Sequence, residues 1–151
     1  FDSHRALSWG SDCTLRLWDL SSGQQVHCLR GHQDPVDDVE VDWDGMHAVS
    51  WTIECNGALL LWDLETGTTK GTCFMGAWQN SLEVKVHWES WRALCISDIQ
   101  EPKLLDLQAG RELLRMVVPS SSGSSDGTLS SASVDWETGY ALAWGSSKEA
   151  L

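Results

Sequence analysis

The chain alternates apolar and polar residues over short stretches, the pattern of β-strands with one buried face. In Asp38–Trp43 the apolar residues stand at every second position, and the residues between them are acidic. Asp44-Gly45 follows as a turn, and Asn56-Gly57 is typical of a tight hairpin. The pattern therefore predicts four strands in a unit of about 44 residues, at 36–43, 47–51, 58–62 and 68–74.

Two phrases repeat along the chain. Leu-Trp-Asp-Leu at 17–20 returns at 61–64 and, with Leu105 in place of Trp, at 104–107, which gives intervals of 44 and 43 residues. A second phrase, an aromatic residue, a polar turn and an apolar run, begins at Phe1, Trp43, Trp88 and Trp136. Such a period is typical of stacked β-units, and four antiparallel strands per unit describe one blade of a β-propeller. The sequence predicts an all-β propeller of four-stranded antiparallel blades.

The expected units are two complete and two partial blades. They are a partial blade at 1–30, blades at 31–75 and 76–118, a Ser/Gly loop at 119–128 and a partial blade at 129–151. So few blades do not close a ring, and open edges favour aggregation. We therefore expect a segment of a larger propeller, or a subunit ordered against partners. The start at Phe1, without an initiator Met, favours a processed product or an excerpt.

The second unit carries Gly31-His32, Ser50, Asn56 and Trp62-Asp63 in this order. The order resembles that of the WD-repeat (Trp-Asp repeat) β-propeller family, in divergent form. The resemblance implies a buried hydrogen-bonded network in each blade, because these side chains can satisfy one another's donors and acceptors. The network residues it implies here are His32, Ser50, Asn56 and Trp62, with Ser8, Asp12 and Trp18 in the preceding unit. It also implies a non-catalytic protein-interaction scaffold.

The third and fourth units depart from this order. Gly76-Ala77 stands in place of Gly-His, Cys95 at the hydroxyl position and Leu105 in place of Trp, while the fourth unit has Ala143 at the hydroxyl position. We expect apolar packing to replace the polar network there.

Eight of the ten tryptophans occupy shared repeat positions and are expected in the core. They are Trp9, Trp51 and Trp144, then Trp43, Trp88 and Trp136, and finally Trp18 and Trp62. Trp78 and Trp91 stand outside the repeat, so they are the candidates for exposed partner-binding residues.

The formal net charge is −12, with 10 basic and 22 acidic residues. This balance argues against nucleic acid and favours proteins with basic segments as partners. Asp38, Glu40 and Asp42 are expected on the innermost strand of their blade, where they form a docking surface that Lys85, at the equivalent position of the next unit, partly neutralises. The sequence has neither an apolar run near membrane-spanning length nor a secretory leader, so no membrane insertion is expected.

The five cysteines have wide spacings and no close pair, which predicts fillers of a reduced intracellular core rather than a metal site. No cofactor is expected, because phosphate-cradling and nucleophile motifs are missing from the sequence. We therefore expect an intracellular location in the cytoplasm, with the nucleus or an organelle as alternatives.

The sequence is compatible with three functions. The first is a protein–protein interaction scaffold, and the second is a structural subunit of a larger complex. The third is a propeller enzyme, a hydrolase or lyase, that would use Asp38, Glu40 and Asp42 with His47 or His87. The regular alternation of these carboxylates favours a polar strand face over a catalytic pair. The serine-rich segment 119–127 is expected to be a flexible surface loop, with a phosphorylated recognition loop as the alternative.

Overall fold

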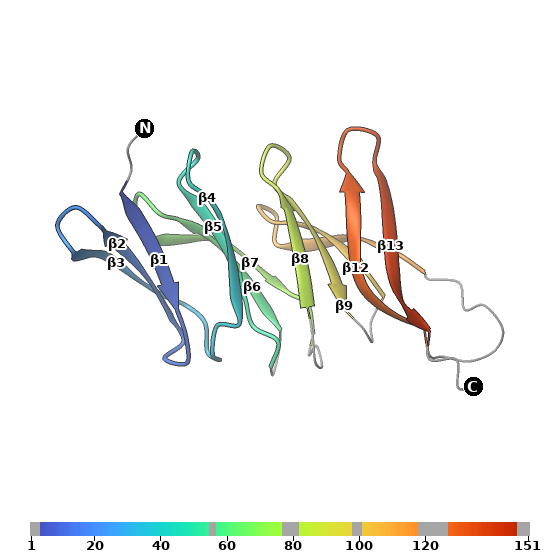
Figure 1. The fold of residues 1–151 in the computed structure, drawn as a ribbon, viewed down its shortest axis with the longest axis horizontal. Helices are drawn as coiled ribbons and strands as arrows, with labels where there is room; N and C mark the ends of the chain where they lie inside the picture. The colour runs from blue at the N-terminus through green and yellow to red at the C-terminus, as the bar shows by residue number, and fades with distance from the viewer. Residues whose placement is uncertain (1–3, 55–56, 77–81, 98–100, 118–126, 148–151) are drawn as a thin grey trace.

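The computed structural model describes residues 4–54, 57–76, 82–97, 101–117 and 127–147, in which all regular structure is β-strand (Figure 1). The prediction of an all-β fold is confirmed. No helix in these ranges has the length and apolarity needed to cross a membrane. The strands are β1 (Arg5–Trp9), β2 (Thr14–Asp19), β3 (Gln24–Arg30), β4 (Asp38–Asp42), β5 (His47–Trp51), β6 (Ala58–Asp63), β7 (Thr68–Phe74), β8 (Leu82–His87), β9 (Arg92–Ser97), β10 (Lys103–Asp106), β11 (Arg111–Arg115), β12 (Gly127–Asp135) and β13 (Tyr140–Ser147).

The described strands form four antiparallel sheets, each built from strands consecutive along the chain. The first sheet has the order β1-β2-β3, the second β4-β5-β6-β7, the third β8-β9-β10-β11 and the fourth β12-β13. Figure 1 shows them side by side in a row, with the β4–β5, β8–β9 and β12–β13 turns at one common edge. The second and third sheets have the four antiparallel strands of a propeller blade.

The repeated Asp and Gly of the sequence form the turns between strands. Asp63 Oδ1 accepts hydrogen bonds from the backbone N–H groups of Glu65 (3.0 Å) and Thr66 (2.9 Å), and Gly67 closes the turn with a φ of 71°. A positive φ suits glycine, which has no Cβ to collide with the backbone. The hydrogen bond from the Thr66 backbone N–H, together with the hydrogen bond and charge of Lys70, lowers the pKa of Asp63 to about 2. Asp19, Asp106 and Asp135 start turns of the same kind, which end at Gly23, Gly110 and Gly139.

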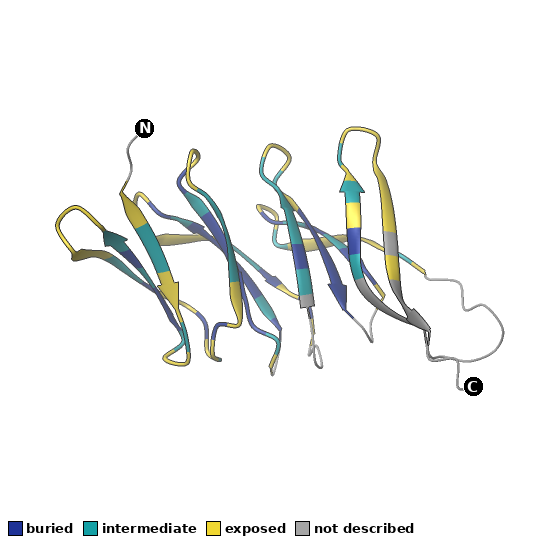
Figure 2. Ribbon diagram, in the orientation of Figure 1, coloured by how far each residue is buried: buried dark blue, intermediate teal, exposed yellow. Residues whose placement is uncertain are grey.

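Hydrophobic cores fill the spaces between successive sheets. Leu15, Leu17 and Leu29 of the first sheet belong to one buried cluster with Leu60 and Trp62 of the second. A second cluster joins the second and third sheets, and a third joins the third and fourth. Figure 2 shows that buried residues concentrate on the strands within the row. A central strand such as β6 therefore buries both of its faces, which explains its continuous apolar sequence.

The repeat position of Trp9, Trp51 and Trp144 is buried inside the row of sheets and exposed at its two ends. Trp51 is 5% exposed, whereas the equivalent Trp9 and Trp144 are 39% and 50% exposed. Each of these two belongs to an end sheet, which has a described neighbour on one side only. Trp62 is 1% exposed, and Trp43, at the β4–β5 turn, is 37% exposed. The expectation of a core position is therefore wrong for Trp9, Trp43 and Trp144. The other tryptophans at shared positions, Trp18, Trp88 and Trp136, are half-buried.

Two glycines allow the second and third sheets to approach closely. A Cβ built on Gly71 of β7 would collide with the backbone carbonyl oxygen of Leu107. Likewise, a Cβ on Gly110 would lie 2.6 Å from the carbonyl oxygen of Thr72. Backbone atoms cannot move aside as the end of a flexible side chain can, so these positions set the spacing between the two sheets.

Replacing Gly71 with Ala is expected to lower the free energy of unfolding by about 1–3 kcal/mol, the range of overpacked interiors. Gly10→Ala is the matched control, because nothing lies within 4 Å of the added Cβ there. Urea unfolding followed by tryptophan fluorescence measures both variants. Equal losses at the two positions would show that Gly71 does not limit the spacing of the sheets.

Candidate functional site

A hydrogen-bonded network lies in the second sheet, on the side that faces the first. Ser50 of β5 is fully buried, and its Oγ accepts a hydrogen bond from the indole Nε1 of Trp62 at 2.8 Å. His32 Nε2 lies 2.6 Å from the same Oγ. A Cβ on Gly31 would lie 2.8 Å from Leu60 Cδ2, so glycine lets the backbone before His32 rest on β6. The structure thus brings His32, Ser50 and Trp62 together, while Asn56 lies outside the described residues.

The imidazole of His32 is held in its neutral form. His32 is 7% exposed, and burial lowers the pKa of its ring to about 4. The negative charges of Asp34 and Asp37 oppose this shift with a smaller effect. The Nδ1 of His32 is buried and has no hydrogen-bond partner. A protonated ring would place an unpaired charge at this boundary, which is costly. The network therefore depends on a pH at which His32 stays neutral.

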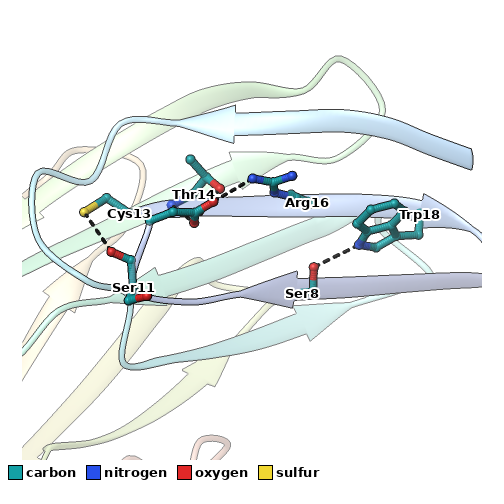
Figure 3. Close-up of polar contacts among 7 residues, drawn as sticks. Ser8, Ser11, Cys13, Thr14, Arg16 and Trp18 are labelled. Carbon is teal, nitrogen blue, oxygen red and sulfur yellow. Dashed lines mark hydrogen bonds and ion pairs between the residues drawn. The ribbon is translucent and has the colours of Figure 1, made fainter.

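The first sheet repeats only part of this network (Figure 3). Trp18 Nε1 donates to Ser8 Oγ at 2.9 Å, as Trp62 does to Ser50. Asp12 does not join this pair, contrary to expectation: its Oδ1 accepts from Thr14 Oγ1 at 2.8 Å, and its Oδ2 pairs with Arg16 at 2.6 Å. The hydrogen bonds from Thr14 and Arg16 lower the pKa of Asp12. Two nearby donors on its own hairpin thus hold this carboxylate away from Trp18.

The acidic row Asp38, Glu40 and Asp42 lies on β4, the edge strand of the second sheet. Asp38 is exposed, and the other two are half-buried. Glu40 Oε2 lies 3.3 Å from the backbone N of Val86 on β8, from which it accepts a hydrogen bond. Burial raises the pKa of Glu40, against the opposing effects of this bond and of the Lys85 charge. The middle of the row therefore faces the third sheet.

Lys85 acts on this row only from a distance. Its Nζ forms an ion pair with Glu83 Oε1, on its own strand, at 2.7 Å. The Lys85 charge opposes the rise in the pKa of Glu40 that burial causes, but no ion pair joins these two residues. Lys85 is thus paired with a carboxylate outside the acidic row.

Trp91 is half-buried rather than exposed, so the expectation for this residue is wrong. Its ring lies edge-on to His47, with 4.7 Å between ring centroids, and it also contacts Trp88. The β8–β9 turn reaches the second sheet here, and Trp91 packs against the core between the two sheets. Trp78, the other candidate, lies outside the described residues.

Both histidines of the enzyme alternative have other partners. His47 Nε2 lies 3.1 Å from Lys70 Nζ, which also pairs with Asp63 at 3.2 Å. His87 stacks on Trp136 with 5.1 Å between ring centroids. In the described part of the chain neither ring hydrogen-bonds to a carboxylate of the acidic row. The sequence pattern did not reveal the His47–Lys70–Asp63 cluster. The strand register reveals it, because His47 and Asp63 are paired across β5 and β6.

The buried cysteines are core residues. Burial raises the pKa of the Cys73 thiol to about 11 and also raises that of Cys95, so both thiols are protonated at neutral pH. Over the described ranges, no group of three His, Cys, Asp or Glu side chains is arranged to hold a metal ion.

A cavity of about 340 Å³ opens beside the first sheet at the β1–β2 turn. The sequence pattern does not reveal this cavity, because the cavity depends on which side of the β1–β2 hairpin is left uncovered in the folded structure. Its lining includes Ser8, Trp9, Ser11, Asp12, Thr14 and Arg16.

Ser50→Ala is expected to lower the free energy of unfolding by about 1–3 kcal/mol, because it leaves the buried Trp62 N–H and the His32 ring without their shared partner. Ser8→Ala, the equivalent change at an exposed serine, is expected to cost less than about 1 kcal/mol. Chemical unfolding of both variants checks this difference. Similar losses would mean that burial of the network does not matter.

The network is also expected to make the fold sensitive to acid. Because the pKa of folded His32 lies below the ordinary value of 6.5, its stabilising effect is complete above about pH 6.5 and is lost as the pH falls toward 4. The loss attributable to this ring is about 2 kcal/mol, allowing for residual contact with water. Unfolding measured from pH 7 to pH 4 should fall less steeply for His32→Gln. Parallel curves for the variant and the unaltered chain would contradict this assignment.

Comparison with known proteins finds similarity in part of the chain. No protein-family profile matches it. Human angio-associated migratory cell protein is 34% identical over 62 residues, which are 39% of this chain and 14% of that protein. ATCSA-1 of Arabidopsis thaliana, a WD repeat-containing protein, is 38% identical over 64 residues, which are 41% of this chain and 14% of that protein. The chain therefore matches only a small part of these relatives' length, and over this part it is similar to WD-repeat proteins.

Proposed function

We propose that this chain is a β-propeller segment that acts as a non-catalytic protein-interaction scaffold. The partial similarity to WD-repeat proteins and the row of antiparallel sheets support this function. The observation that carries it is the acidic row on β4, the edge strand of the second sheet, with Lys85 of the neighbouring sheet paired to Glu83 and not to the row.

The partner segment that fits this surface is basic. Asp38 is exposed at the start of the row, and the chain as a whole carries a formal net charge of −12. Lysine or arginine side chains of a partner would meet complementary charge here, which speeds association and selects the partner. The same charge disfavours nucleic acid and anionic membrane surfaces.

A structural subunit of a larger assembly is the second candidate. The exposed apolar residues of the fourth sheet favour it: Tyr140 and Leu142 are 77% and 71% exposed, and Trp144 lies beside them on β13. Exposed apolar surface of this kind is typical of sites covered by another protein surface. The enzyme alternative lacks such support, because His47 and His87 are engaged in contacts between and within sheets.

The scaffold proposal predicts that the double change Asp38→Lys and Glu40→Gln weakens binding of a peptide of alternating lysine and serine about three- to tenfold at low salt. The salt dependence of binding should flatten as well, since fewer charge contacts remain to be screened. Fluorescence anisotropy of the labelled peptide measures both effects on the full chain.

Glu65→Lys is the matched control, because Glu65 is exposed on the β6–β7 turn and is not part of β4. It should change affinity less than about twofold. If the double variant bound the peptide as well as the unaltered chain and only its unfolding midpoint moved, the row would be structural. The docking proposal would then be abandoned.

A further inference from the structure

The turns at the common edge of the second, third and fourth sheets begin with the same residue type. Trp43, Trp88 and Trp136 directly follow β4, β8 and β12, the first strands of these sheets, and each opens the turn to the next strand. Figure 1 shows the three turns one after another along the row of sheets. Trp43 is 37% exposed, and the other two are half-buried. Each indole therefore keeps part of its surface in contact with solvent.

An acidic residue directly follows each of these tryptophans. Asp44, Glu89 and Glu137 are all exposed. In the described part of the chain, none of the three forms an ion pair with a lysine or arginine side chain. Glu89 lies 4.0 Å from the His87 ring, which carries a charge only when it is protonated. The three carboxylates are thus available to cations of another molecule.

The carboxylates that precede two of the tryptophans have a different role. Asp42 Oδ1 accepts a hydrogen bond from the backbone N–H of Gly45 at 3.0 Å, and Asp135 Oδ1 accepts one from that of Glu137 at 3.0 Å. These bonds stabilise the turns themselves. The surface available to a partner, called the tryptophan edge below, therefore consists of Trp43-Asp44, Trp88-Glu89 and Trp136-Glu137.

Contacts between neighbouring turns fix the spacing of the tryptophan edge. Trp91 of the β8–β9 turn packs edge-on against His47 of the second sheet, with 4.7 Å between ring centroids. Trp136 of the β12–β13 turn stacks on His87 of the third sheet at 5.1 Å. Because packed sheets lie about 10 Å apart, the edge presents an indole and a carboxylate at intervals of about this length.

The chemistry of this edge fits arginine better than lysine. A guanidinium is planar, stacks on an indole and donates paired hydrogen bonds to a carboxylate, whereas an ammonium is a compact, strongly hydrated charge. In a polyproline II segment the side chains on one side recur every three residues, and three residues span about 9 Å. This length matches the interval between the turns.

We propose that the tryptophan edge binds an extended protein segment that carries an arginine at every third position. Each guanidinium lies against one indole and pairs with the acidic residue that follows it. Arg92 is paired in register with His87, next to Trp88, so its charge weakens the middle position. The Trp43 position is accordingly the one to test.

The test is fluorescence anisotropy of a labelled peptide, Arg-Ser-Pro repeated three times, titrated with the full chain at low salt. This peptide should bind about three- to tenfold more tightly than the same peptide with lysine in place of arginine. Trp43→Leu should weaken binding of the arginine peptide about three- to tenfold and remove most of the preference for arginine. Trp9→Leu is the matched control, because Trp9 is 39% exposed and ends β1 away from the turns, and it should leave binding unchanged.

Asp44→Asn provides a second variant if Trp43→Leu does not fold, because Asp44 is an exposed turn residue. It should weaken binding of the arginine peptide about two- to fivefold. The proposal does not rest on the acidic row of β4. The double change Asp38→Lys and Glu40→Gln should therefore keep the preference for arginine over lysine, which separates the two proposals.

Equal binding of the arginine and lysine peptides would overturn the proposal, since it would show attraction by charge without recognition by indole rings. An arginine preference that survives both Trp43→Leu and Asp44→Asn would overturn it as well. Maltohexaose serves as a further probe. If it bound to the chain but not to Trp43→Leu, and the arginine peptide did not bind, the tryptophans would belong to a carbohydrate site instead.

Discussion

The structure depends on the burial of both faces of its sheets. A strand places alternate side chains on opposite faces, so a sheet with apolar residues on both faces needs a neighbour on each side. β6 meets this condition, and its residues Leu59 to Leu61 are almost fully buried. β13 has a described neighbour on one face only, and Leu142 is correspondingly 71% exposed. The tandem arrangement thus explains why Trp51 is buried whereas the equivalent Trp9 and Trp144 are exposed.

The polar contacts follow from the same packing. A serine between two sheets is removed from water, so its hydroxyl must be satisfied by protein groups, as Ser50 is by Trp62 and His32. Desolvation then keeps the imidazole neutral. At Ser8, whose hydroxyl no second sheet covers in the described part of the chain, the bond to Trp18 is kept but the residue is exposed to solvent. Glycine also has a positional role, because Gly31, Gly71 and Gly110 stand where a backbone lies directly on a neighbouring element.

These features fit a protein that works through surfaces. The charged residues of β4 lie at a sheet edge, the fourth sheet exposes aromatic and aliphatic side chains, and the first sheet has an open cavity with hydrogen-bonding groups. The three surfaces differ in chemistry. Two of them, on the first and fourth sheets, belong to the ends of the row, where the packing of sheet on sheet stops.

The sequence by itself determined the strands and the turns. Period-2 alternation, the Asp-to-Gly turns and the repeat of about 44 residues are local signals, and they predicted four strands for the second unit close to those observed. They also identified Ser50 and Trp62 as corresponding to Ser8 and Trp18, because repeat positions can be aligned without a structure. Only the tertiary structure decided which copies are buried. Exposure of Trp9 and Trp144, the packing of Trp91 on His47 and the ion pair of Lys85 with Glu83 depend on neighbouring sheets and side-chain direction, and neither is encoded in local periodicity.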